Sequence, residues 1–191
     1  GVVGRHLVAC DLLSNPFNVH WSALNDVTGW TAGTNQSDTQ TLPDGGRARA
    51  VVEVAGGLGF IIQEQALRRM TWMPGSGVIF QIDRVPNGRG TTAPYSVVVA
   101  DGGAYWSSPR GFVKVDAGGG VEPVGQEKVD RTFLGAHEAS APASVQDLAW
   151  DSGNSRLVIG TTGSSDPVNG NLILWVYKRP NAAPNLFDRG F

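Results

Sequence analysis

The chain has 191 residues, of which 41% are hydrophobic and only 17% are charged, a composition that excludes an intrinsically disordered protein. Its formal net charge of −2 gives no electrostatic basis for tight nucleic-acid binding, which needs clustered Lys and Arg. The single cysteine, Cys10, excludes an intrachain disulfide, and no apolar run approaches the ~20 residues of a membrane-spanning helix.

Short runs of β-branched and aromatic residues, separated by glycine-rich turns, predict stacked antiparallel sheets, as in a propeller blade or a sandwich. In the first unit, residues 5–46, strands are predicted over 5–10 and 18–24. The polar segment 33–46 is predicted to be a loop. Because the chain begins at Gly1 without Met, we expect it to start inside a longer gene product or after processing.

The next two units give the clearest patterns. Residues 47–86 predict a meander of four strands, over 48–55, 59–64, 66–72 and 78–84. Residues 96–133 predict another, with strands over 96–100, 103–107, 111–115 and 121–124. The pairs Gly56-Gly57 and Gly102-Gly103 lie 46 residues apart, close to the ~40–50-residue period of propeller blades.

The last unit, residues 145–178, predicts strands over 145–150, 156–161 and 171–177, and the tail 179–191 has no periodicity. The sequence therefore predicts one all-β domain over 1–191, made of antiparallel four-stranded blades of a β-propeller. The propeller is incomplete or part of a longer chain, since only three to four blades are visible and a full propeller needs at least four.

Several motifs occur in an order that spans residues 5–133. They are Asn18-Val19-His20-Trp21-Ser22 with Asn25-Asp26 and Gly29-Trp30, then Leu42-Pro43-Asp44-Gly45-Gly46, Phe60-Ile61-Ile62-Gln63-Glu64 with Leu67-Arg68-Arg69-Met70, Gly88-Arg89-Gly90, and Gln126-Glu127-Lys128-Val129-Asp130-Arg131. This order resembles a family of propeller-like tail and head-completion proteins of tailed bacteriophages, of the nozzle or packaged-DNA stabilisation type.

The resemblance implies a structural virion protein of the tail or head–tail junction, made in the host cytoplasm. It implies a ring of copies, a hexamer, that also contacts portal, adaptor or other tail proteins. Such a ring surrounds the DNA path, retains packaged DNA and passes it non-specifically through the lumen at ejection. No enzyme activity and no cofactor are expected, because the sequence has no catalytic constellation, no metal-type spacing of its histidines and no phosphate-binding glycine loop before a helix.

Candidate subunit contacts come from four features. Trp30 lies outside the predicted strands, and the polar segment 33–46 that follows it is expected to project outward or to cross to the next unit. Two adjacent arginines face opposite ways on a strand, which favours a salt link or a subunit contact over a phosphate grip. Residues 126–131 alternate in charge, as a register device between subunits or as a solvated connector. Two tail phenylalanines could dock on a neighbour. The residues are Trp30, Gln36, Asp38, Arg68, Arg69, Glu127, Lys128, Asp130, Arg131, Phe187 and Phe191.

The alternative function is a carbohydrate-binding or carbohydrate-cleaving propeller of a phage adsorption device, and a generic protein-interaction propeller is a third option. The carbohydrate function requires aromatic rings and carboxylates on one face. Turn aspartates that bond their own backbone explain the candidate carboxylates more simply, namely Asp83, Asp101, Asp116, Asp151 and Asp166. Blade packing likewise explains the strand tryptophans, namely Trp21, Trp72, Trp106, Trp150 and Trp175.

Overall fold

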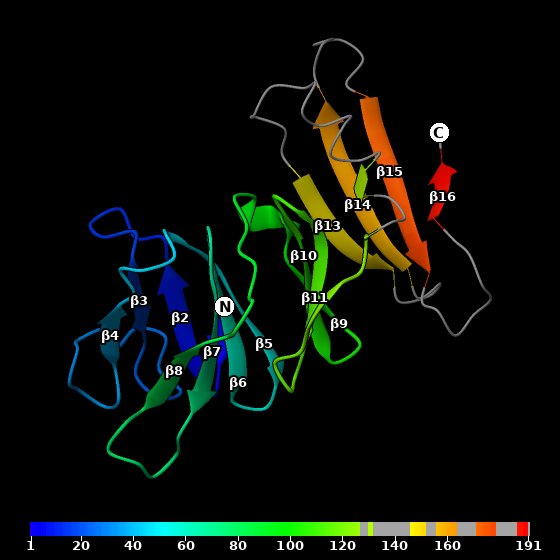
Figure 1. Cartoon of the computed structure of the whole chain (residues 1–191). Coiled ribbons are helices and arrows are strands. Elements are labelled where there is room, and N and C mark those ends of the chain that lie inside the picture. Colours follow the sequence, from blue (N-terminus) through cyan, green and yellow to red (C-terminus); the bar gives the residue numbers. More distant parts are fainter. Residues whose placement is uncertain (127–129, 132–145, 152–155, 164–170, 179–186, 191) are drawn as a thin grey trace.

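The chain folds into antiparallel sheets of four strands each, and the described residues contain four of them (Figure 1). The structure is a computed structural model. It describes residues 1–126 and 130–131, and the backbone of 146–151, 156–163, 171–178 and 187–190. In every sheet the strands follow one another in chain order, so each sheet is a simple meander. The predicted all-β class and the four-stranded antiparallel sheets are confirmed.

The first sheet contains two strands that the sequence does not predict. Its strands are β1 (Val2–Val3), β2 (His6–Cys10), β3 (Asn18–Trp21) and β4 (Asp38–Thr41). The prediction of a loop over 33–46 is wrong for β4, which pairs with β3 along its whole length. As an edge strand β4 needs only one neighbour, and its side chains are largely exposed, so it carries no hydrophobic alternation.

The second sheet agrees closely with the prediction. It consists of β5 (Ala48–Ala55), β6 (Leu58–Gln63), β7 (Leu67–Trp72) and β8 (Phe80–Arg84). Every residue of β6 after Leu58 is buried. A strand covered on both faces reads as a continuous apolar run rather than as an alternation. The second sheet is therefore an inner layer of the molecule.

The third sheet follows a 3₁₀ turn, η1 (Pro94–Ser96), that replaces the predicted start of a strand at Ser96. Its strands are β9 (Val98–Ala100), β10 (Gly103–Ser108), β11 (Gly111–Asp116) and β12 (Val121–Pro123). The turn between β9 and β10 consists of Asp101 and Gly102, which both have positive φ, at 48° and 70°. Two positive φ values in a two-residue hairpin match the twist of the flanking strands, which fixes their register.

The fourth sheet is described by its backbone. It contains β13 (Gln146–Asp151), β14 (Arg156–Gly163), β15 (Asn171–Lys178) and β16 (Phe187–Gly190). The prediction of a tail without regular structure is wrong at β16, which pairs with β15 from Tyr177 opposite Phe187 to Leu174 opposite Gly190. β16 is four residues long and lies at a sheet edge, where a periodic pattern is hardest to read.

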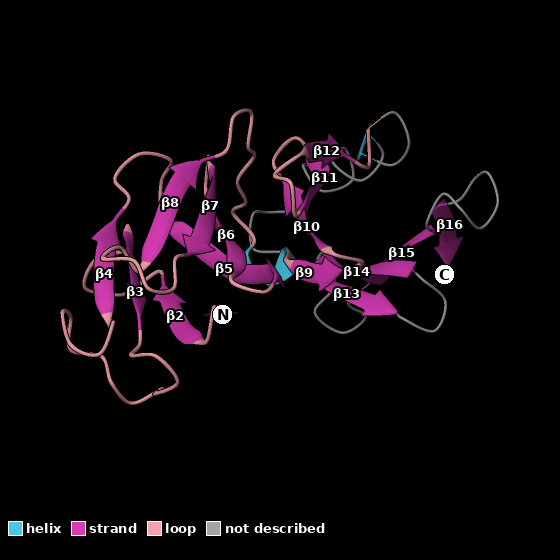
Figure 2. Ribbon diagram, turned by 90° about the horizontal axis from the view of Figure 1, so that it is seen from below, coloured by secondary structure: helices cyan, strands magenta, loops and turns pink. Residues whose placement is uncertain are grey.

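Consecutive sheets meet through their first strands. β5 contacts β1 and β2 of the first sheet and β9 and β10 of the third, and β13 contacts β9 and η1. Figure 2 shows the sheets fanning out from these inner strands, with β4, β8, β12 and β16 at the outer rim. Among the described residues, the first and fourth sheets share no contact as extensive as those between neighbours. The four sheets thus form an open fan.

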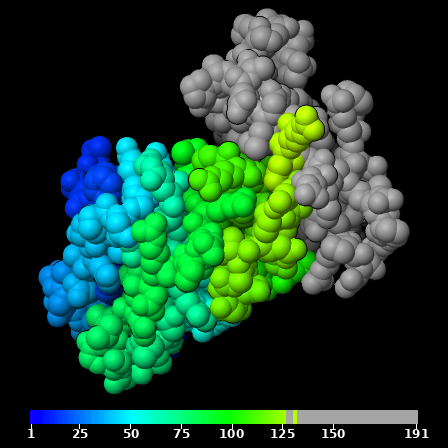
Figure 3. Space-filling view, in the orientation of Figure 1, coloured from blue at the N-terminus to red at the C-terminus, as the bar shows by residue number. Residues whose placement is uncertain are grey.

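We call the interface between two consecutive sheets a joint. Two hydrophobic cores fill the first two joints of the fan. The first core, between the first and second sheets, contains Val8, Trp21, Ile61, Met70 and Phe80 among others. The second core, between the second and third sheets, contains Phe60, Ile62, Leu67, Trp106 and Val113 among others. Consecutive β6 residues alternate between the two cores, as the period of a strand requires. Figure 3 shows the first three sheets packed as a continuous body.

The predicted packing role of the strand tryptophans is confirmed where their side chains are described. Trp21 and Trp106 are buried, and Trp72 is partly buried against the first core. Full burial of a side chain of this size contributes roughly 2–3 kcal/mol. The side chains of Trp150 and Trp175 lie outside the described part of the chain.

Candidate functional site

The contact candidates of the first sheet lie in β4 and in the loop that precedes it. Trp30 lies in the loop between β3 and β4, is half-buried, and packs edge-on against His20 at 5.1 Å between ring centroids. Its Nε1 donates to the carbonyl of Val27 at 2.8 Å. Gln36 is exposed, and its carbonyl accepts the Trp21 Nε1 hydrogen bond at 3.0 Å, while Asp38 begins β4. Their contact with a neighbour stays a prediction.

Arg68 binds residues of its own chain, at the joint between the first and second sheets. It is only 8% exposed, forms a salt bridge with Asp44, and donates from Nε to Gln63 Oε1 at 2.7 Å. The predicted salt link is confirmed, with Asp44 as the partner. Arg84 donates to the other oxygen of Asp44 at 2.9 Å. Desolvation acts to raise the pKa of Asp44, but the charge of Arg68 and the hydrogen bonds from both arginines hold it below its ordinary value.

Gln63 belongs to the same hydrogen-bonded group as Arg68, Asp44 and Arg84, which we call the polar clasp. Its side chain is fully buried, and Nε2 donates to the carbonyls of Leu42 at 3.1 Å and Gly46 at 2.8 Å. The linker between β4 and β5 is therefore fixed to the second sheet by side-chain hydrogen bonds as well as by packing. A buried amide with all its described partners in place costs little and specifies one arrangement.

Arg69 faces the opposite way, as the strand period predicts. It is half-buried, and its guanidinium donates to the carbonyl of Ala117 in the third sheet at 3.4 Å. Arg68 and Arg69 thus bind to opposite neighbours of the second sheet. This separation argues against a joint grip on one ligand.

The interpretation of residues 126–131 as a solvated connector is wrong for Asp130. Asp130 is 8% exposed, and its Oδ1 accepts a hydrogen bond from the Phe112 amide at 3.0 Å. A Cβ at Gly111 or Gly125 would collide with its carboxylate, so both glycines make room for it. Burial raises the pKa of Asp130, against the opposing effects of the Phe112 hydrogen bond and the charge of Arg89.

The remaining candidates are placed in part. Arg131 is exposed, and Phe187 is the first residue of β16. Glu127, Lys128 and Phe191 lie outside the described residues. Where the eleven candidates are described, they are spread over the four sheets and do not form a single cluster.

Charged side chains that the sequence analysis does not single out lie together at one end of the sheets. Here the turns between second and third strands meet the linkers that lead to the next sheet. At the first joint, Asp11 binds Arg47 at 2.7 Å and Arg49 at 3.2 Å. Arg49 also binds the carboxylate of Glu64. Two arginines and two carboxylates therefore balance one another at this joint.

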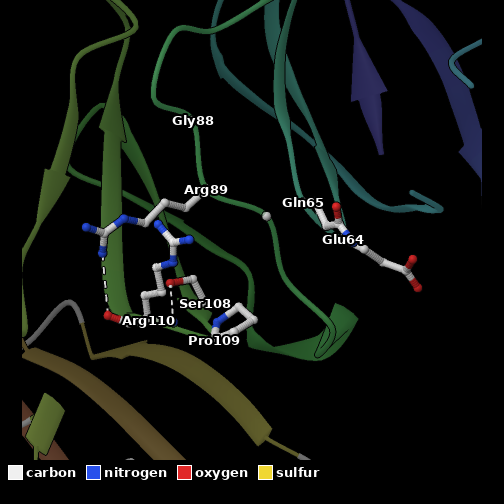
Figure 4. A pocket seen from close by; sticks show the side chains of 8 residues that line it. Glu64, Gln65, Gly88, Arg89, Ser108, Pro109 and Arg110 are labelled. Atoms are coloured by element: carbon white, nitrogen blue, oxygen red, sulfur yellow. Dashed lines mark hydrogen bonds between the residues drawn. The ribbon is translucent and has the colours of Figure 1, made fainter. Parts of the chain in front are cut away.

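The second joint has a pocket at the same end (Figure 4). Its volume is about 370 Å³. Three segments line it, namely the turn after β6 with Glu64 and Gln65, the linker with Gly88, Arg89 and Gly90, and the turn after β10 with Ser108, Pro109 and Arg110. The one sequence signal for it is an arginine beside glycine in both Gly88-Arg89-Gly90 and Arg110-Gly111.

The carboxylates needed for carbohydrate cleavage do not gather in this pocket. Asp116 accepts the Gly120 amide at 2.9 Å, which confirms its role as a turn aspartate. Asp83 differs from the prediction, because it lies within β8 and accepts from the Gln81 side chain at 2.8 Å. Asp101 lies in the β9–β10 turn, and the side chains of Asp151 and Asp166 are outside the described part.

Within the described residues, no group of His, Cys, Asp and Glu is placed to hold a metal ion. No helix in that part of the chain is long and apolar enough to cross a membrane. No protein-family model and no curated protein matches the chain.

Proposed function

We propose that this chain is a structural protein of a tailed-phage virion, at the tail or head–tail junction. In this proposal its four sheets are blades of an incomplete β-propeller within a ring of copies around the DNA path. The observation that carries the proposal is the open fan, in which consecutive four-stranded meanders meet through their first strands and, within the described residues, the first and last sheets share no contact as extensive as those between neighbours.

The propeller assignment draws support from the inner position of β1, β5, β9 and β13. In a propeller, the first strand of each blade lines the central axis and the fourth forms the outer rim. The alternation of Phe60, Ile61 and Ile62 between two cores fits a blade that packs on both neighbours. A sheet at the end of such a fan has one face without a blade beside it.

The first sheet has a face suited to a neighbouring copy. Ala9 and His20 are directly paired on the face opposite the first core, and Leu7 shares that face by the strand period. All three are half-buried, and Trp30 packs on His20. In the proposed ring, this face meets a blade of the next subunit, and Trp30 contributes an aromatic anchor of the kind enriched at interfaces.

Ion pairing within the chain supports the proposed passage of DNA without tight binding. Four arginines of the first two sheets, Arg47, Arg49, Arg68 and Arg84, are paired with carboxylates. Paired guanidiniums release few counterions from DNA, so they add little to its affinity. In the proposed ring, arginines paired in this way leave the DNA mobile along the axis.

Immunogold electron microscopy tests the virion location. An antibody against the purified chain is applied to phage particles released from a culture that expresses this gene. We expect label at the neck or tail of intact particles. Label that remains entirely in the soluble cell fraction would contradict the proposal, and defined binding of the purified chain to sugars on a glycan array would then favour an adsorption role.

A further inference from the structure

The pocket at the second joint has an arginine on each of two converging segments. Arg89 lies in the linker after β8 and is half-buried, and Arg110 is exposed in the β10–β11 turn. Figure 4 shows the two guanidinium groups close together on the same side of the pocket. A hydrogen bond from Arg89 to the Arg110 carbonyl, at 3.5 Å, ties the linker to the turn.

The turn that carries Arg110 is held in one conformation. The Ser108 hydroxyl donates to the Gly111 carbonyl at 2.6 Å and accepts from the Arg110 amide at 3.3 Å. The linker is held as firmly, because Gly90 lies against the backbone of Gln63 and Glu64 with no room for a Cβ. Both arginines therefore project from fixed backbone, which lowers the entropy lost when they bind.

Neither guanidinium is in an ion pair with a described carboxylate. Two carboxylates are near, and both are engaged elsewhere. Glu64 binds Arg49 and accepts the Arg47 amide at 3.3 Å, and in Figure 4 its carboxylate extends away from the arginine pair. Asp130 interacts with the charge of Arg89 but accepts its hydrogen bond from the Phe112 amide. The pocket therefore has a surplus of positive charge.

The first joint shows what is missing at the second. There, Asp11 in the turn after β2 forms salt bridges with both Arg47 and Arg49. At the second joint, the turn after β6 also begins with a carboxylate, Glu64, but Glu64 binds Arg49, and its neighbour Gln65 is exposed and uncharged. The turn carboxylate at the first joint thus binds the arginines that follow the linker, whereas at the second joint it leaves Arg89 and Arg110 without an ion pair among the described residues.

We propose that this pocket binds a phosphate monoester through Arg89 and Arg110. A monoester carries a charge of about −1.5 to −2 at pH 7 and three acceptor oxygens, which match two unpaired guanidinium groups. Guanidinium forks bind phosphate oxygens in a bidentate geometry that a single lysine cannot provide. The volume of about 370 Å³ leaves room for the group that bears the phosphate. This site does not depend on the proposed virion role.

Titration with inorganic phosphate at constant ionic strength tests the site, with amide chemical shifts as the readout. We expect saturable shifts at the pocket segments that an equal concentration of chloride does not reproduce. Arg89→Gln and Arg110→Gln should each weaken binding about tenfold, since each removes charge-assisted hydrogen bonds. Arg47→Gln is the matched control, because it removes a guanidinium from the same end outside the pocket, and it should change binding less than about twofold.

Two results would overturn the proposal. The first is phosphate binding that survives unchanged in the double variant Arg89→Gln, Arg110→Gln, whose retained fold is verified by its amide spectrum. The second comes from a short single-stranded oligonucleotide with and without a 5′-phosphate. Equal binding of the two forms would assign the site to DNA backbone diesters, whereas a preference for the 5′-phosphorylated form supports the monoester.

Discussion

Gly90 is a position where a single added carbon would separate two segments that must touch. A Cβ there would lie 2.1 Å from the Gln63 carbonyl oxygen, and no side-chain movement can relieve a clash with backbone. The neighbouring Thr91 amide donates to that same carbonyl at 2.9 Å. The linker after β8 is therefore held to the end of β6 by direct backbone contact.

Gly90→Ala should lower the free energy of unfolding by about 1–3 kcal/mol, because the clash forces the linker away from β6. Urea unfolding followed by tryptophan fluorescence measures the change. Gly56→Ala is the control, since a Cβ at Gly56 has nothing within 4 Å and should cost less than about 0.5 kcal/mol. Equal losses in the two variants would refute the contact as the cause.

Asp130 gives the stability a pH dependence of known sign. Because burial raises its pKa in the folded state, the folded chain binds this proton more tightly than the unfolded chain does. The stabilisation is full below the unfolded pKa of about 3.9 and is lost as the pH rises through the folded pKa. Asp44 acts in the opposite direction, because its pKa is lowered.

Asp130→Asn should therefore gain stability relative to the native chain as the pH is raised from 4 to 7, because the variant carries no buried charge. Thermal unfolding of both proteins across this range measures the difference, in which the contributions of Asp44 and the other carboxylates cancel. A difference that does not vary with pH would show that Asp130 titrates alike in the folded and unfolded chains.

At the scale of elements, the polar clasp decides how the first sheet meets the second. Arg68 is buried and bonds both Asp44 and Gln63, whereas Arg84 is exposed and reaches only Asp44. The two arginines thus share one carboxylate in different environments. Loss of the buried arginine leaves the Oε1 of Gln63 without its Arg68 donor, and a buried acceptor without a donor is the costly case.

Arg68→Ala should cost about 1.5–3 kcal/mol of unfolding free energy, and Arg84→Ala less than about 1 kcal/mol. Chemical denaturation of the two variants measures the contrast. A loss for Arg84→Ala as large as that for Arg68→Ala would mean that the Asp44 charge pair, and not the buried hydrogen-bond network, holds this joint.

Most of the strands that the sequence predicts pack on other sheets, although β1, which contacts β5, is only two residues long and is missed. β5 to β8 and β9 to β12 follow the predicted bounds within a few residues, because Phe60, Ile62 or Trp106 must alternate into a core. β4 and β16 are missed because edge strands are held by backbone pairing with one neighbour. The polar run of Asp38, Thr39, Gln40 and Thr41 has no pattern that distinguishes it from a loop.

The candidate site is harder to predict than the fold. Arg68 is singled out from the sequence, but its partner Asp44 lies 24 residues earlier and meets it only through sheet packing. Arg89 and Arg110 come from different sheets' connections and converge at the second joint. The local sequence shows only an arginine beside a glycine at each position, and this pattern does not indicate a particular ligand.

At the scale of the whole molecule, the open fan leaves the face of the first sheet with Leu7, Ala9 and His20 without a second sheet packed on it in the described part of the chain. Trp30→Asp should weaken association of the chain with itself, because a charge in a desolvated contact is costly. Val27→Asp is the control, because Val27 is exposed in the same loop and its carbonyl, which Trp30 uses, is retained. Sedimentation velocity of the two variants measures the difference, and equal sedimentation profiles would exclude Trp30 from the contact.

Native mass spectrometry of the purified chain over a range of protein concentrations tests most directly whether these sheets are blades shared among copies. We predict one discrete oligomer with a fixed number of subunits, six if the family resemblance holds, whose population rises with concentration. A monomer at every concentration, or a continuous ladder of masses without a preferred size, would contradict a ring.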